Sequence, residues 1–127
     1  MGKTRFSFRA RLLSFKYAFN GLRLLMAEHN AWIHCFAAVC VVVFGFIFDI
    51  SPMEWVAVTL AMGAVLSAEA FNTAVETLAN YVCEERKEAI KNTKDLSAAG
   101  VLLTVVAAAI VGLVVFIPKI VDFLDRI

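Results

Sequence analysis

The chain has 127 residues, and 61% of them are hydrophobic. Because soluble domains average roughly 45–50% apolar residues, this composition excludes an ordinary soluble domain and predicts a membrane protein. The formal net charge is only +1, but residues 1–27 contain six basic side chains and no acid. The three cysteines have no metal-ligand spacing and make no even disulfide set.

Residues 5–28 predict an amphipathic helix that lies on the membrane surface. Apolar side chains recur at steps of three and four residues and share one helical face: Phe8, Leu12, Phe15, Phe19, Leu22 and Met26. Basic side chains lie on the adjoining face, where anionic headgroups would attract them. A solvent-facing arm is the alternative, but it would leave the apolar stripe without a surface to pack on.

Three apolar segments follow, and each predicts a transmembrane helix: 32–48, 55–82 and 96–117. The first contains His34, which we expect to be an interfacial or packed histidine rather than a ligand. Pro118 and Lys119 are expected to end the third, whose many small residues favour close helix packing. The expected fold class is an all-α membrane protein with one surface helix and three transmembrane helices, in a single domain over 1–127.

The distribution of basic residues predicts the topology. The N-terminal segment and the 83–95 loop together hold ten of the twelve Lys and Arg residues, and the 49–54 link holds none. The positive-inside rule therefore places the N-terminus and the 83–95 loop in the cytoplasm. Glu28 and Glu76 then lie at the same cytoplasmic boundary.

The second apolar segment carries Glu69, Asn72 and Glu76 at offsets of 0, 3 and 7, so the three side chains share one helical face. Measured from Trp55 at about 1.5 Å per residue, Glu69 lies about 21 Å along the helix and Glu76 about 31 Å. In a hydrocarbon core about 30 Å thick, Glu76 reaches the far interface and Glu69 stays about 10 Å below it. Ionisable groups at such depth are costly and are functional candidates.

These residues fit phosphoryl transfer from a cytosolic nucleotide to a membrane alcohol. Glu28 and Glu76 would hold Mg²⁺, which binds one or two carboxylates together with substrate phosphates. Glu69 would act as a general base on a lipid hydroxyl, and Asp95 would fix an amine or a ribose. Three cations would meet the phosphates: Arg86, Lys87 and Lys94. No P-loop or protein-kinase motif is present. A polar cluster that only holds helices together remains an alternative on spacing alone.

The run EAFNTAVE at 69–76, followed by a charged loop and Lys94-Asp95, resembles the small prokaryotic diacylglycerol kinase and undecaprenol kinase family. The stretch 15–23 and Glu28-His29-Asn30 also resemble it, although the family often has Asn-Glu-Arg-Asn where this chain has Ala-Glu-His-Asn at 27–30. The resemblance implies a homotrimer with active sites shared between subunits. It also implies a location in the bacterial cytoplasmic (inner) membrane, with the active site on the cytoplasmic side.

Carried over by position, the resemblance implies a role for each motif residue. Glu69 is the general base, Asn72 supports it, and Glu28 and Glu76 bind the metal. Arg9 lies on the substrate side, with Arg11 as its alternative under a small register shift. The nucleotide-binding set comprises Tyr17, Glu28, Glu76, Glu85, Arg86, Lys87, Lys94 and Asp95.

The expected donor is Mg-ATP, and undecaprenol is favoured as acceptor over diacylglycerol because the sequence of the third segment looks closer to undecaprenol kinases. No nucleic-acid partner is expected. A proton-coupled transporter is a rival from another class, but three spans make no repeat pair and the acids gather at one interface. A membrane scaffold is a second rival, and it would not need a basic loop facing two glutamates.

Overall fold

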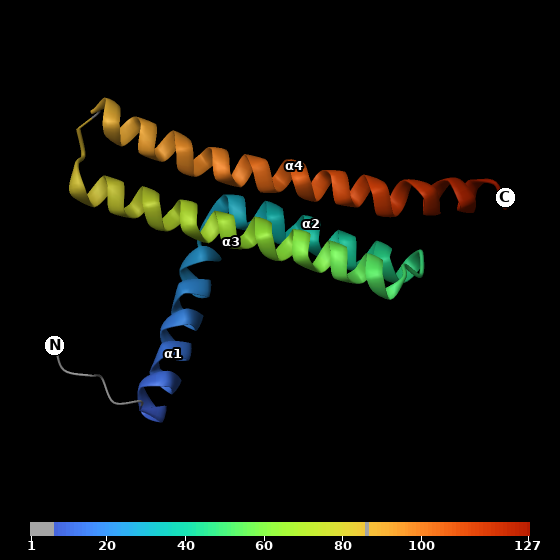
Figure 1. Cartoon of the computed structure of the whole chain (residues 1–127), viewed down its shortest axis with the longest axis horizontal. Helices are drawn as coiled ribbons and strands as arrows, with labels where there is room; N and C mark the ends of the chain where they lie inside the picture. Colours follow the sequence, from blue (N-terminus) through green and yellow to red (C-terminus); the bar gives the residue numbers. More distant parts are fainter. Residues whose placement is uncertain (1–6, 86) are drawn as a thin grey trace.

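The computed structural model describes residues 7–85 and 87–127, so the predicted nucleotide residue Arg86 lies outside the described residues. The described chain forms four helices: α1 (Phe8–Leu25), α2 (His29–Ile47), α3 (Pro52–Val82) and α4 (Glu88–Leu124). Helices α2, α3 and α4 run along the long axis of the molecule, and α1 projects steeply away from them (Figure 1). The three long helices are each apolar and long enough to cross a membrane. The all-α fold class is confirmed.

Helix α1 is shorter than the predicted segment 5–28. Ser7 caps its first turn by accepting a hydrogen bond from the amide of Ala10 at 3.4 Å. At its end, Ala27 and Glu28 donate to carbonyls only three residues back, at 3.1 and 3.0 Å, which tightens the chain into a turn before α2. The predicted apolar stripe is exposed in the single chain, as expected for a helix that packs on lipid.

The link between α2 and α3 is compact. Ser51 and Glu54 form a capping box at the start of α3, with Pro52 at the first helical position. Gly45 permits the close approach of Trp55 to the facing helix, since a Cβ at this position would lie 2.6 Å from a carbon of the Trp55 ring. A small core of Ile50, Val58 and Val115 joins α3 and α4 beside this link.

Helix α4 corrects two predictions. The segment 83–95 is not a loop throughout, because α4 already begins at Glu88, whose carboxylate lies in the favourable first turn of the helix. Pro118 does not end the helix, which continues to Leu124 although proline removes one backbone hydrogen bond. Contact between the rings of Phe123 and Phe48, 6.2 Å apart, holds the added turns against the end of α2.

Candidate active site

Glu69 is the one buried charged side chain in the described part of the chain, with 2% of its surface exposed. It projects from α3 toward α2, where His34 Nε2 lies 3.9 Å from its Oε1. A buried carboxylate without close partners is costly. The position of Glu69 therefore indicates a role other than stabilising the fold.

Side-chain exposure increases along the helical face from Glu69 to Glu76, in the order predicted from their positions along the helix. Asn72, one turn on, is half-buried, and Glu76, one further turn on, is exposed. The Asn72 side-chain oxygen is buried and has no hydrogen-bond partner among the described residues. Since nearly all buried polar atoms in proteins are paired, this oxygen is available to accept a hydrogen bond from a bound molecule.

A polar cleft of about 580 Å³ lies where α3 ends and α4 begins. Its lining includes four of the predicted nucleotide residues: Glu85, Lys87, Lys94 and Asp95. Lys94 Nζ donates to Asn80 Oδ1 at 3.0 Å and so links α4 to α3. The cleft thus gathers cations and acids from two helices and from the connection between them.

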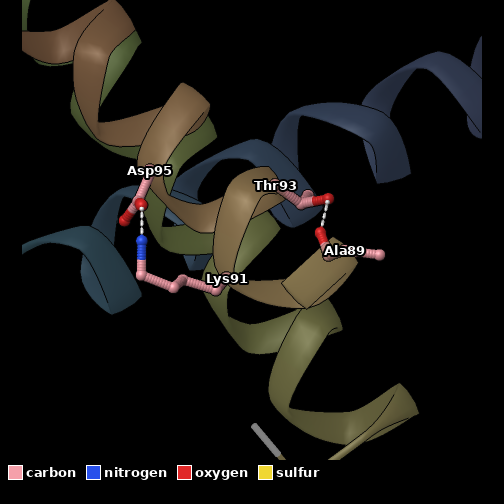
Figure 2. A network of polar contacts seen from close by, with 4 residues as sticks. All are labelled: Ala89, Lys91, Thr93 and Asp95. Carbon is pink, nitrogen blue, oxygen red and sulfur yellow. Dashed lines mark hydrogen bonds and ion pairs between the residues drawn. The ribbon is translucent and has the colours of Figure 1, made fainter. Parts of the chain in front are cut away.

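Within this cleft, Lys91 holds Asp95. Lys91 Nζ lies 2.7 Å from Asp95 Oδ2, one turn along α4, and Thr93 donates to the Ala89 carbonyl at 2.9 Å (Figure 2). Both charged side chains are mostly exposed, as is the looser pair of Lys87 and Glu85 at 3.8 Å. Exposed pairs of this kind contribute little to stability, so these side chains can exchange partners with a bound ligand.

Besides Glu69 and Asn72, four predicted residues do not line the cleft. Tyr17 and Arg9 lie on α1, where both are exposed, and Glu28 precedes α2 without a side-chain cap bond. Neither Glu28 nor Glu76 forms an ion pair or a side-chain hydrogen bond within residues 7–85 and 87–127. In a single chain these groups are therefore separate from the cleft.

The described residues contain no group of three or more metal-binding side chains in one place. Two carboxylates are nevertheless enough for a Mg²⁺ ion that also binds phosphate oxygens and water. Glu28 and Glu76, both exposed and without a partner in the described chain, are chemically suited to supply them.

Two residues beside the site were not predicted. His34, which the sequence predicts to be an interfacial or packed histidine, is half-buried and lines an apolar cavity of about 290 Å³ between α2, α3 and α4. Its approach to Glu69 is not predicted. No spacing within one helix could reveal a contact between helices. Asn80 does continue the spacing of Glu69 and Glu76 along the same face, and that pattern could have identified it.

Comparison with known proteins places most of the chain in one group. The sequence pattern of the family described as prokaryotic diacylglycerol kinase matches residues 16–116, a range that includes every predicted site residue except Arg9. An undecaprenol kinase of Bacillus subtilis is 33% identical over 107 residues, which make up 84% of this chain and 87% of the relative.

Two further relatives are named diacylglycerol kinase. A diacylglycerol kinase of Synechocystis is 30% identical over 115 residues, covering 89% of this chain and 66% of the relative. A diacylglycerol kinase of Haemophilus influenzae is 30% identical over 102 residues, covering 80% of this chain and 84% of the relative.

Proposed function

This chain belongs to the prokaryotic diacylglycerol kinase family and is an integral-membrane lipid kinase, and we propose that it phosphorylates undecaprenol with Mg-ATP as donor. The relative with 33% identity is named undecaprenol kinase, which supports this acceptor. Diacylglycerol is the second candidate, because two relatives at 30% identity are named diacylglycerol kinase.

The observation that carries the mechanism is the buried Glu69 on α3, the helix whose C-terminal end lines the polar cleft. In our proposal, Glu69 accepts the proton of the lipid hydroxyl while the hydroxyl oxygen attacks the γ-phosphorus. The bond from that phosphorus to the β,γ-bridging oxygen breaks, and ADP leaves. Catalysis of this transfer consists mainly of positioning and charge stabilisation. Asn72 supports the base from the next turn of α3.

We assign the nucleotide to the cleft and its surroundings. Lys94 and Lys87 would neutralise phosphate charge, and Asp95 and Glu85 would accept hydrogen bonds from the sugar or base. The remaining predicted contacts are Tyr17 and Arg86 for the nucleotide and Arg9 for the lipid substrate.

Glu28 and Glu76 would hold the Mg²⁺. The metal, when bound, neutralises the charge of the transferring phosphate. In our proposal these two carboxylates would supply the protein's ligands to the metal.

We further propose that the active enzyme is a homotrimer with shared sites, in the bacterial cytoplasmic membrane and open to the cytoplasm. Glu69 and Asn80, the partner of Lys94, are eleven residues apart on α3. At about 1.5 Å per residue they are about 16 Å apart along the helix, which favours a second subunit completing the site. The basic residues of the N-terminus and the 83–95 segment support the orientation.

The acceptor is tested with purified protein in lipid vesicles, γ-labelled Mg-ATP, and undecaprenol and diacylglycerol offered separately. We expect label in undecaprenyl phosphate at a kcat/KM at least about tenfold above that for diacylglycerol, a difference of about 1.4 kcal/mol. A preference for diacylglycerol would reverse the assignment of the acceptor. Label in neither lipid, beside active control enzymes, would reject the kinase mechanism.

A further inference from the structure

We propose that His34 is a further residue of the transfer site, where it orients the acceptor hydroxyl against Glu69. This inference rests on the proposed function and adds to it the residue that holds the attacking oxygen. His34 lies on α2 and Glu69 on α3, so the two side chains approach each other across a helix interface.

The distance between the two side chains fits a bound oxygen. His34 Nε2 and Glu69 Oε1 are 3.9 Å apart, which is too long for a direct hydrogen bond. An oxygen at an ordinary hydrogen-bond distance of about 2.8 Å from each atom fits between them. Such an oxygen would accept a hydrogen bond from the imidazole N–H and donate its own proton to the carboxylate.

The surroundings leave both groups without other partners. Neither side chain forms a hydrogen bond to any residue in the described parts of the chain. Among the described residues that line the apolar cavity of about 290 Å³, His34 is the only one with a polar side chain; the walls also include Ala38, Met62 and Gly112. An imidazole that served only as packing would need no polar neighbour there, whereas a hydroxyl-orienting imidazole needs the adjacent base.

In this reaction His34 donates a hydrogen bond but transfers no proton. The hydroxyl proton passes to Glu69, the oxygen forms its bond to the γ-phosphorus, and the ADP oxygen leaves. Negative charge grows on the attacking oxygen as its proton departs, and the imidazole N–H donates to that oxygen throughout. Removal of one preorganised donor of this kind typically lowers kcat by about 10²–10³-fold.

The experiment uses the full-length protein in vesicles with Mg-ATP and undecaprenol. For His34→Ala we expect kcat to fall by about 100-fold, with the KM for ATP unchanged because the nucleotide cleft lies elsewhere. His34→Gln, which keeps an N–H donor, should recover at least about a tenth of the lost rate. Imidazole added at millimolar concentration should partly restore His34→Ala, since the deleted ring leaves space beside the existing cavity.

Met62→Leu is the matched control, because it changes the wall of the same cavity without altering a polar group, and it should retain wild-type kcat. Thermal unfolding of each variant in detergent reports its folding. A kcat for His34→Ala within about threefold of wild type overturns the inference. So does an equal loss in His34→Gln and His34→Ala with no rescue by imidazole, which would identify a packing role. Wild-type protein inactive on every lipid alcohol overturns the proposed function itself.

Discussion

Two glutamates on α3, seven residues apart, occupy opposite environments. Glu69 is buried against α2, whereas Glu76 is exposed beyond Asn72. A carboxylate in apolar surroundings is suited to act as a general base, because little bulk water is present to exchange protons with it. An exposed carboxylate is better placed to bind a hydrated metal ion that arrives with the nucleotide. In our proposal the same residue type thus has two functions, with Glu69 as the base and Glu76 as a metal ligand.

Glu76→Gln should raise the Mg²⁺ concentration for half-maximal activity by at least about tenfold, because even groups outside the metal's own ligands cost about 10–100-fold in affinity when removed. The measurement is initial rate against free Mg²⁺ at saturating ATP. Asp122→Asn, which changes an exposed acid near the end of α4 opposite the cleft, serves as control and should leave the Mg²⁺ dependence unchanged. An unchanged Mg²⁺ dependence in Glu76→Gln would remove this residue from the metal site.

The helices and one face of the site could be predicted because their signals are local. Hydropathy over 20 or so residues defines a span, and offsets of 3 and 7 place Glu69, Asn72 and Glu76 together. The C-terminal end of α4 and the approach of His34 could not be predicted in this way. The first depends on Phe123 meeting Phe48, and the second on α2 meeting α3, both contacts between segments far apart in the sequence.

At the level of helix packing, Gly45→Ala should destabilise the contact between α2 and α3. The added methyl group would lie 2.6 Å from a carbon of the Trp55 ring, so the ring or the helix must shift. Overpacking of this kind typically costs about 1–3 kcal/mol. Thermal unfolding in detergent measures the loss. Gly63→Ala, whose new methyl group would meet nothing within 4 Å, should not lower the unfolding temperature. Equal stability of both variants would contradict the packing described for α2 and α3.

Because Lys94 lines the cleft between α3 and α4, we expect Lys94→Met to weaken the binding of ATP. Loss of one charge-assisted hydrogen bond of about 1.5–3 kcal/mol should raise the KM for ATP by at least about tenfold, with little change in the KM for undecaprenol. Steady-state kinetics with each substrate varied in turn measures both constants. Lys119→Met alters a lysine at the opposite end of the bundle, where it pairs with Glu54 at 3.3 Å, and should leave the KM for ATP unchanged. A Lys94→Met enzyme with normal KM would exclude this lysine from the nucleotide site.

At the scale of the whole molecule, a single chain leaves large apolar side chains exposed along all three long helices, including Phe36, Leu60 and Ile110. Lipid and neighbouring subunits together would cover them. The single chain also separates Glu28, Tyr17 and the polar cleft. Both observations favour an assembly in which one subunit supplies residues to the site of another.

Shared sites predict that two impaired variants, assayed at an ATP concentration below the wild-type KM, restore activity in mixed assemblies. Co-expression of Glu69→Gln with Lys94→Met chains, which carry different tags, should yield mixed trimers in which some sites receive both wild-type residues. Native mass spectrometry of detergent-released protein gives the subunit number, and tandem affinity purification isolates the mixed assemblies. Activity in the mixed fraction well above either parent supports shared sites. A monomeric active enzyme, or mixed trimers no more active than the parents, would contradict them.

The measurement that tests the central claim most directly is transfer of label from γ-labelled Mg-ATP to undecaprenol by wild-type protein and by Glu69→Gln, side by side in vesicles. The substitution removes the proposed base but almost no volume, so assembly and unfolding temperature should stay near wild type. The account predicts labelled undecaprenyl phosphate from wild type and a rate at least about 10³-fold lower from the variant, within the range expected for loss of a general base. Near-normal transfer by Glu69→Gln would contradict it.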